Sequence, residues 1–381
     1  MKATVAKPTD DRRGRPIRVW DLPTRLFHWL LAAAVAVGAV TGFLAPEWML
    51  GLHAWSGYGL GALILFRIVW AVFGSEYSRV DSFAFPPRTV FRHLRDLASG
   101  RAAHHLGHNP AGAAMIFALA AVLSGIVATG LVALGGQEKQ GPLAGVVSFD
   151  SGHAAREIHE VLTILLLVLV GLHVAGVVLE SLRERSNLVA AMITGRKAAL
   201  PGAGIPALRR ARPIAAIAAL TAMAAIVSAG VAALAALPPR GVPRLAPYPV
   251  YEKECGACHY DFHPSLLPAD SWSAMMAGLE DHFGEDASLP PKTRDEIAAW
   301  LAANAAERWD TEAANAFRKV ASDQPLSVTA TRYWKRRHRD IPDAVFAAKP
   351  VGSKVNCIAC HRDARSGRFD DQSIDIPKEK P

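Results

Sequence analysis

Five long apolar runs divide the first part of the chain, and each is about as long as a helix must be to cross the hydrocarbon core of a bilayer. The runs cover residues 26–46, 52–73, 111–134, 157–180 and 214–237. The first run contains no charged residue, and the polar, basic segment 1–25 before it is too long for an ordinary signal peptide. The pattern therefore predicts five transmembrane helices, of which the first is uncleaved.

The rest of the chain lacks such runs. Residues 272–279 and 293–306 have the apolar spacing of short amphipathic helices, and strong strand signals are few. We expect an all-α protein with a four-helix transmembrane bundle, a fifth transmembrane helix and a loop-rich, mostly α C-terminal domain. The predicted parts are a cytoplasmic N-terminus (1–25), the bundle (26–196), a cytoplasmic loop with the fifth helix (197–240) and the C-terminal domain (241–381).

Charge is distributed unevenly along the chain. Residues before Gly241 carry 23 Lys and Arg against 13 Asp and Glu, whereas the residues from Gly241 onward carry 19 against 21. In the first part the basic residues gather before the first run, between the second and third, and between the fourth and fifth. The positive-inside rule makes these segments cytoplasmic, so we expect a bacterial inner-membrane protein with a periplasmic C-terminal domain and no nucleic-acid partner.

The fourth apolar run carries two histidines, His159 near its start and His173 further in. They are 14 residues apart, so both lie on one helix face, about 21 Å from each other along the axis. A histidine inside a membrane needs a partner, and a hydrogen bond to a neighbouring helix is the simpler alternative to a functional role. Depth matches His53 with His159 and His28 with His173, which predicts two bis-histidine b-type haems in the bundle.

Further residues of the second run suit a haem. Gly57, Gly59 and Gly61 would let a flat macrocycle approach the helix backbone, although ordinary helix packing explains them nearly as well. Arg67 lies near the cytoplasmic end of this run. We expect it to pair with a propionate of the inner haem; the alternative is that it snorkels to the interface.

All cysteines of the chain fall in two CxxCH motifs, at Cys255–His259 and Cys357–His361. In a c-type haem site the two thiols bond to the haem vinyl groups and the adjacent histidine binds the iron. The motifs therefore predict two covalent haems, held by Cys255, Cys258, Cys357 and Cys360, with His259 and His361 as proximal ligands. Half a zinc site and a redox dithiol are the alternatives.

Each of these two irons also has a sixth coordination position. We expect His282 at the first c haem and His338 at the second, which gives six-coordinate centres. His263, Met275 and Met276 are the alternatives for the first haem, and His263 is too near its own proximal ligand to reach the opposite haem face easily. The alternative for both His282 and His338 is a surface histidine in a charged segment, and it applies above all to His338.

Two groups of residues are candidates for the proton transfers of quinone chemistry. They are Asp150, His153, Glu157 and Glu160 at the start of the fourth run, and His93, His104, His105 and His108 between the second and third. The simpler interpretation is that both groups are solvated loop residues. A metal-binding role for HHLGH has still less support from the sequence.

Residues 18–196 resemble the bacterial cytochrome b561 and nickel-iron hydrogenase b-type cytochrome family, through WDLPTRLFHW, HAWSGYGLGALILFRIVW and the His-x13-His of the fourth run. Residues 248–377 are similar to dihaem cytochromes c, through CGACHYDFHPSLLPADSWSAMMAGLEDHFGEDASL, TRYWKRRHRDIP and CIACHRDARSGRFDDQSIDIP. The resemblance implies b-haem ligands and distal c-haem ligands at His28, His53, His159, His173, His282 and His338.

Two haems in the bilayer and two outside it would pass electrons between the quinone pool and a soluble periplasmic redox protein, with quinol as the expected donor. The protein would then be a quinol:cytochrome c-type oxidoreductase or otherwise an electron carrier, and an oligomer is compatible with the sequence. Three other functions stay open: the electron-relay anchor of a larger oxidoreductase complex, a superoxide:quinone oxidoreductase and a haem-based gas sensor. The last requires a five-coordinate haem.

Overall fold

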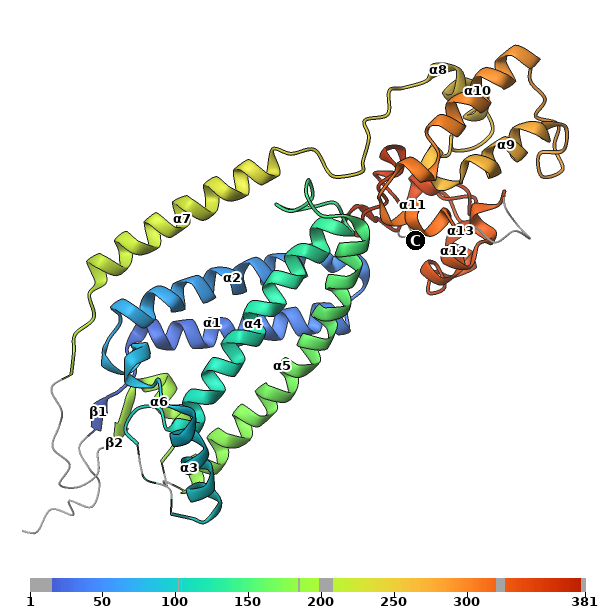
Figure 1. The fold of residues 1–381 in the computed structure, drawn as a ribbon. Coiled ribbons are helices and arrows are strands. Elements are labelled where there is room, and N and C mark those ends of the chain that lie inside the picture. The colour runs from blue at the N-terminus through green and yellow to red at the C-terminus, as the bar shows by residue number, and fades with distance from the viewer. Residues whose placement is uncertain are drawn as a thin grey trace, which may run out of the picture. The chain divides into compact units, whose positions relative to one another are not determined.

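A computed structural model describes residues 16–101, 103, 105–183, 186–198, 208–319 and 326–377 of the chain (Figure 1). Over these residues it has thirteen α-helices, a number of short 3-10 turns and one two-stranded sheet. The predicted all-α class is confirmed, with the small sheet as the one addition in the described part of the chain.

Five helices among the described residues are long and apolar enough to cross a membrane, which confirms the number of predicted spans. They are α1 (Leu22–Phe43), α2 (Leu50–Phe73), α4 (Pro110–Gly136), α5 (Phe149–Arg183) and α7 (Pro213–Ala235). Helix α5 begins well before residue 157, because Ser148 Oγ accepts a hydrogen bond from the backbone N–H of Ser151 (3.3 Å) and so caps the helix. The polar residues after Ser148 therefore belong to the helix rather than to the loop.

The chain divides into two compact units. The first comprises the chain up to Phe43, His53–Ala128 and Ile158–Ala229, and the second comprises Leu44–Leu52, Thr129–Glu157 and the chain from Gly230 onward. The connections between α1 and α2 and between α4 and α5 thus pack with the C-terminal region.

An apolar layer lies in the interior of the first unit, where α1, α2, α4 and α5 form a bundle (Figure 1). Leu60 of α2, Leu123 and Ile126 of α4, and Leu166 of α5 are buried against one another. Many apolar side chains on the other faces of these helices are exposed, as expected where a helix meets lipid. The bundle therefore has a buried apolar interior. The outer faces of its helices are apolar as well.

Helix α7 packs on α2 through a small residue. Ala216 is buried against Val69 and Trp70, which matches the close packing that the many alanines of this helix permit. Ile214 and Ile217 of the same helix remain exposed.

Polar side chains tie α1 to α2 at one end of this unit. The Asp21 carboxylate accepts hydrogen bonds from Trp70 Nε1 (3.0 Å) and from the hydroxyls of Ser75 (2.7 Å) and Ser78 (3.1 Å). Burial by itself raises the pKa of Asp21, but the hydrogen bonds from Thr24, Ser75 and Trp70 outweigh burial and leave the pKa below its usual value. Asp21 therefore stays ionised and holds the two helix ends together.

The remaining elements of the first unit are short. Helices α3 (Pro87–Ala98) and α6 (Leu188–Thr194) follow α2 and α5 in the chain. Strand β1 (Pro16–Arg18) pairs antiparallel with β2 (Arg196–Ala198). The sequence analysis did not predict these elements.

The second unit contains six short helices, α8 (Pro249–Cys255), α9 (Ala269–Ala277), α10 (Pro291–Ala303), α11 (Glu312–Phe317), α12 (Arg332–Arg337) and α13 (Asp343–Ala347). Helices α9 and α10 are the two that the apolar spacing predicts. Helix α9 begins directly after Pro268, and α10 begins with Pro291, whose ring fixes φ for the first turn.

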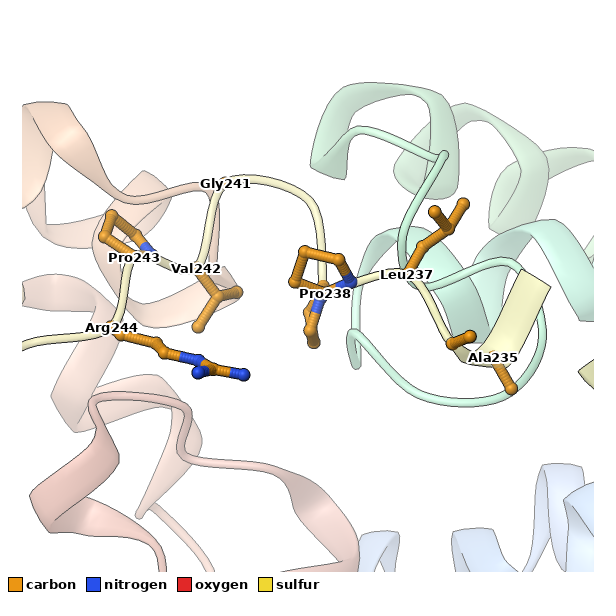
Figure 2. A pocket seen from close by; sticks show the side chains of 9 residues that line it. Ala235, Leu237, Pro238, Gly241, Val242, Pro243 and Arg244 are labelled. Atoms are coloured by element: carbon orange, nitrogen blue, oxygen red, sulfur yellow. The ribbon is translucent and has the colours of Figure 1, made fainter. Parts of the chain in front are cut away.

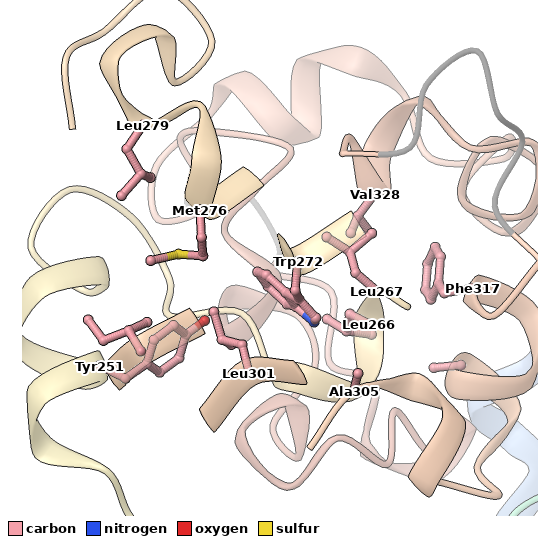
Figure 3. Packing of buried hydrophobic residues seen from close by; sticks show 12 residues of the cluster. Tyr251, Leu266, Leu267, Trp272, Met276, Leu279, Leu301, Ala305, Phe317 and Val328 are labelled. Atoms are coloured by element: carbon pink, nitrogen blue, oxygen red, sulfur yellow. The ribbon is translucent and has the colours of Figure 1, made fainter. Parts of the chain in front are cut away.

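The core of the second unit lies between α9 and α10 (Figure 3). Trp272 is buried there with Leu266 and Leu301, and Trp272 Nε1 donates to Pro264 O (2.8 Å). Met276 is buried in the same cluster, which gives it a packing role.

Charged side chains join the loop after α4 to the C-terminal region within this unit. Lys139 is only 1% exposed, and its Nζ donates to Asp310 Oδ2 (2.8 Å). Arg337 donates to both Glu47 Oε1 (2.7 Å) and Asp371 Oδ1 (2.8 Å). Since both contacts involve a largely buried cation, they fix the C-terminal region against the two helix connections more firmly than exposed ion pairs would.

Two glycines let α4 and α5 approach closely in the same unit. A methyl group added to Gly136 would lie 2.5 Å from the Cα atom of Gly152, and one added to Gly152 would lie 2.6 Å from the Cα atom of Gly136. Any larger residue at either position would therefore push the two helices apart.

Three carboxyl groups lie near this junction, those of Glu138, Asp370 and Asp371. All three pKa values are raised, mainly because the groups are buried. The pKa of Asp370 and that of Asp371 are each about 6, and the pKa of Glu138 lies well above its usual value. Arg368 and Arg337 lower the first two in part. A raised pKa means that the folded state binds more protons than the unfolded chain, so these groups stabilise the fold at low pH and oppose it as the pH rises through about 6.

Replacing Glu138 by Gln is therefore expected to raise the thermal midpoint by about 2–4 °C at pH 8 and to change it little at pH 5. Circular dichroism of the detergent-solubilised protein at the two pH values measures the effect. The exposed acid Glu252, changed to Gln, serves as the control. A Glu138→Gln shift of equal size at both pH values would contradict the assignment.

Candidate haem sites

Two histidines face each other between α2 and α5. The ring centroids of His53 and His159 lie 6.1 Å apart. His53 Nδ1 is 3.1 Å from Gly38 O, and His159 Nδ1 is 3.0 Å from Ile126 O. Because a carbonyl oxygen can only accept, each Nδ1 carries the proton and donates. Each Nε2 is then unprotonated, which is the form that binds a metal.

A second pair lies between α1 and α5. The ring centroids of His28 and His173 are 6.4 Å apart. Leu166, from the buried apolar layer, lies midway between His159 and His173 on α5. His28 Nδ1 is buried and has no hydrogen-bond partner among the described residues. The structure thus brings together both pairs that the sequence matches by depth.

The first CxxCH motif follows directly from α8, which ends at Cys255. Cys258 is exposed, and His259 faces His282 with ring centroids 6.0 Å apart and planes only 21° from parallel. His259 Nδ1 donates to Tyr260 O (2.7 Å). The loop after α9 therefore supplies the histidine expected at the sixth position.

The second motif is built in the same way from a different part of the chain. His361 follows Cys357 and Cys360, and its ring centroid lies 6.0 Å from that of His338, the residue after α12. His338 Nδ1 donates to Trp334 O (2.9 Å), and the two rings stack at 4.3 Å. Burial, more than the neighbouring charges, lowers the pKa of His361 to about 4, so the imidazole is neutral and suited to bind iron.

The four spacings fit an iron atom between two imidazoles. Two metal–nitrogen bonds of about 2 Å, with about 1 Å from each Nε2 to its ring centre, place the centroids about 6 Å apart. Aromatic rings that merely pack also lie about 4.5–7 Å apart, so one such pair would mean little. Here four pairs have ring centroids 6.0 to 6.4 Å apart, and each pair joins two residues that were predicted as partners. This agreement supports an iron atom between the rings of each pair.

Helix α2 leaves room for a flat ring beside His53. Gly57 lies four residues further on, on the same face of the helix, and a methyl group added there would meet no atom within 4 Å. Gly61, in contrast, would bring its methyl group within 3.4 Å of Val127 Cγ1. Of the glycines suggested by the sequence, Gly57 is thus the one that combines the histidine face with open space.

His263, the alternative sixth ligand of the first c haem, does not face His259. Its Nδ1 accepts a hydrogen bond from the backbone N–H of Ser265 (3.3 Å), and its ring packs edge-on against Trp309 at 4.5 Å. Burial lowers its pKa to about 4. His282, rather than His263, lies opposite His259.

Arg67 is held by the protein near the polar end of the bundle. Its Nη1 donates to Ser78 O (3.0 Å), and its guanidinium lies 5.6 Å from the centre of the Phe83 ring. These contacts point the cation into the first unit rather than outward along its surface, as snorkelling would require.

The first group of proton-transfer candidates lies on the opening turns of α5. His153 Nε2 is 3.6 Å from Glu157 Oε1, and both side chains are exposed. Asp150 and Glu160 are also exposed. The structure therefore joins two of the four residues in a solvent-accessible acid–base pair.

The second group is separated. His93 and His105 lie with ring centroids 5.5 Å apart, whereas His108 packs against Phe83 at 5.0 Å, and His104 lies outside the described residues. Burial lowers the pKa of His108 to about 3. Among the described residues, no three His, Cys, Asp or Glu side chains gather as a metal site.

The cysteine thiols bear on the alternatives to haem attachment. Burial is the main cause that raises the pKa of Cys255 to about 11 and that of Cys357 to about 12. A redox dithiol needs a lowered pKa, and a zinc site needs further ligands that do not gather in the described part of the chain. Both alternatives are therefore disfavoured.

A hollow of about 670 Å³ lies where α7 ends, and no histidine lines it (Figure 2). Residues 235–239 and 241–244 line it, with Arg244 as the one ionisable group among them. The backbone N–H of Arg240 donates to Ala144 O (2.8 Å), which holds this linker to the loop after α4. The hollow has no acid–base pair of the kind that quinone chemistry requires.

The sequence analysis missed the residues that orient the ligands. The hydroxyl oxygen of Thr41 lies 3.1 Å from His53 Nδ1. Gly38, one turn earlier, supplies the carbonyl oxygen that accepts from His53 Nδ1. A methyl group at Gly42 would come within 3.2 Å of the His53 ring. The signal that would have found them is the row of small residues in the second half of the first apolar run.

Comparison with known proteins divides the chain in the same way as its motifs do. The family model described as prokaryotic cytochrome b561 matches residues 19–195. A protein of Cupriavidus necator named "Probable Ni/Fe-hydrogenase B-type cytochrome subunit" is 28% identical over 208 residues, which cover 46% of this chain and 85% of the relative. A protein of the same name from Bradyrhizobium diazoefficiens is 26% identical over 230 residues, covering 52% and 93%.

The family model described as dihaem cytochrome c matches residues 251–369. The crystal structure of a dihaem cytochrome type c from Shewanella baltica is 36% identical and covers 34% of this chain and 91% of its own, with a TM-score of 0.27. A dihaem cytochrome c structure from Rhodobacter sphaeroides is 38% identical and covers 33% and 100%, with a TM-score of 0.26. Residues 19–195 therefore belong to the prokaryotic cytochrome b561 family and residues 251–369 to the dihaem cytochrome c family, which makes the chain a multi-pass membrane electron-transfer cytochrome.

Proposed function

We propose that this cytochrome carries electrons from membrane quinol to a soluble periplasmic redox protein, through two b haems and two c haems. The observation that carries the proposal is the set of four facing histidine pairs, with ring centroids 6.0–6.4 Å apart. Haem, when bound, supplies the one-electron carriers. The protein's own part is to hold each group, to set its surroundings and to exclude other chemistry.

The membrane pairs would hold the two b haems without covalent bonds. Gly38 and Ile126 orient His53 and His159 by accepting from Nδ1–H, which fixes the tautomer and increases the basicity of Nε2. Two histidines at each site would leave a bound haem without an open coordination position, which favours electron transfer over oxygen binding. Arg67, turned into the first unit, would pair with a propionate of the inner haem.

The two CxxCH motifs would hold the c haems covalently. Cys255 and Cys258 would hold one haem together with His259 and His282, and Cys357 and Cys360 would hold the other together with His338 and His361. Covalent attachment keeps both groups in a small domain whose helices are only 5 to 13 residues long. The c-type region is thereby stabilised by cofactors that its own modest core cannot replace.

Orientation in a bacterial inner membrane follows from charge and from the attachment chemistry. The basic segments, including 1–25, would face the cytoplasm, and the chain beyond Gly241 would face the periplasm. His153 and Glu157 would then lie on the periplasmic side, where their acid–base pair could take up the protons that quinol releases. On this basis the reaction class is quinol:cytochrome c-type oxidoreduction.

A second function has its own support. The relatives of the membrane part are named as hydrogenase B-type cytochrome subunits, so the chain would alternatively be the electron-relay anchor of a larger oxidoreductase complex. Superoxide oxidation is disfavoured because Asp150, Glu157 and Glu160 make the opening turns of α5 acidic rather than an anion-attracting funnel. Gas sensing is disfavoured because two histidines at each site would leave a bound haem without an open coordination position.

The proposal is tested on protein purified in mild detergent from native membranes. We expect a pyridine haemochrome assay to give two b and two c haems for each chain, and anaerobic duroquinol to reduce both kinds. Carbon monoxide should leave the reduced spectrum unchanged. Haem c alone would contradict the proposal, and a stably co-purifying catalytic subunit would support the anchor function instead.

A further inference from the structure

The loop after α9 exposes an aromatic side chain beside the first c-haem site. Among the described residues from Gly241 onward, the exposed large apolar side chains are Phe283 (65%) and Ile358 (40%). Ile358 lies inside the second CxxCH motif, and the Phe283 ring packs edge-on against His282 with centroids 5.0 Å apart. The exposed large apolar side chains of this region thus lie at the two haem sites.

The backbone holds Phe283 in this position. His282 and Glu285 pair through their backbones, with His282 N donating to Glu285 O (2.8 Å), and Phe283 sits between them at φ 57°. Phenylalanine rarely adopts this left-handed conformation. Leu279, buried in the core, anchors the loop at its base (Figure 3).

Acidic residues flank Phe283 in the chain on both sides. They are Glu280, Asp281, Glu285 and Asp286, all exposed and without an ion pair in the described part of the chain. Asp281 Oδ1 and Asp286 Oδ1 accept hydrogen bonds from backbone N–H groups, whereas the side chains of Glu280 and Glu285 form neither a hydrogen bond nor an ion pair with the described residues. The rim therefore carries an uncompensated negative charge.

The second c-haem site differs in charge, because its basic side chains are paired with acids. Exposed Arg362, Arg365 and Lys354 lie within ion-pair distance of Asp375 (4.0 Å), Asp261 (3.0 Å) and Asp343 (2.7 Å), respectively. The turn Asp371–Ser373 near this site packs against Glu47–Met49 of the α1–α2 connection, so part of its surface is covered within the second unit. A basic protein would therefore be drawn to the first site more than to the second.

We propose that Phe283 and its acidic rim form the surface on which a soluble, one-electron redox protein with a basic face docks. The proposal rests on the proposed function and names its partner by chemistry. One electron leaves the first c-haem site, which is oxidised, and the docked partner is reduced by the same electron, without bond or proton transfer. Phe283 is the contact centre, and the rim steers the encounter.

The test uses the full-length, haem-loaded protein and oxidised mitochondrial cytochrome c as a basic probe. Binding is measured by isothermal titration at low and high salt, and electron transfer by stopped flow. We expect Glu280→Lys with Glu285→Lys to weaken binding and slow association about tenfold at low salt, with the difference fading as salt rises. Phe283→Asn, which tolerates the left-handed backbone, should weaken binding at all salt concentrations.

The matched control reverses two other exposed acids, Glu296→Lys with Asp340→Lys, and so makes the same change in net charge. An equal effect of control and rim variants would overturn the proposal, as would unchanged binding in the rim variant. Loss of self-association, measured by sedimentation, would identify a second copy as the occupant and would also overturn it. Haem content and reduction by duroquinol are recorded for every variant. A failure of quinol reduction in the parent protein would count against the proposed function, not against docking.

Discussion

Replacing His159 by Leu is expected to remove one of the two b haems and to leave the other b haem and both c haems in place. His159 faces His53 at 6.1 Å, and no other described histidine ring lies opposite His53. The pair His28–His173 lies elsewhere along α5, on the far side of the buried apolar layer. A leucine fills the space without offering a ligand, so the effect is confined to one site.

The haem ratio from a pyridine haemochrome assay measures this effect, and the reduction of the c haems by duroquinol should fall to the background rate. Thr163→Ala is the control, because it lies one turn further along α5 and loses only a hydrogen bond to His159 O (2.8 Å). An unchanged b-haem content in His159→Leu would show that the facing imidazoles are structural. Loss of both b haems would show that the two sites do not form independently.

Replacing Lys139 by Met is expected to destabilise the second unit by about 3 kcal/mol, since one member of a buried ion pair is removed while the other keeps its charge. Lys139 is 1% exposed and Asp310 27%. The carboxylate would retain only its hydrogen bonds from neighbours such as the backbone N–H of Phe149 (2.9 Å). Limited proteolysis in the Pro-rich linker 238–247 should then become faster, because its neighbours separate more often.

The partner substitution provides the control for this prediction. Asp310→Leu combined with Lys139→Met removes both charges, and the double variant should regain most of the lost stability. Urea unfolding of the single and double variants gives the coupling energy. Additive losses in the double variant would contradict a direct Lys139–Asp310 interaction.

Sequence patterns were sufficient for the features that depend on one periodicity or one motif. The spacing of His159 and His173 fixes their face and depth on a helix, and depth alone then selects His53 and His28 as partners. The choice of His282 over His263 followed from the short distance between His263 and its neighbouring ligand. The structure places His282 opposite His259, in agreement with that choice.

Features that depend on long-range packing could not be predicted in this way. Lys139 lies in GGQEKQG, which has the composition of a solvated loop, and its burial depends on Asp310, far away in the chain. The left-handed backbone at Phe283 depends on the pairing of the residues that flank it. The start of α5 was missed because the polar turns after Ser148 lack apolar periodicity, while the capping serine decides where the helix begins.

Helix α7 joins the two family regions in one chain, and this also affects how fast the contacts around Lys139 open and close. A covalent tether holds a released domain at a local concentration that is roughly millimolar for a short linker. Opening and closing of the contact between Lys139 and Asp310 would therefore be first-order processes, independent of how much protein the membrane contains. A separate soluble dihaem cytochrome would have to find its membrane partner by diffusion, whereas here every bundle is joined to one dihaem domain at fixed one-to-one stoichiometry.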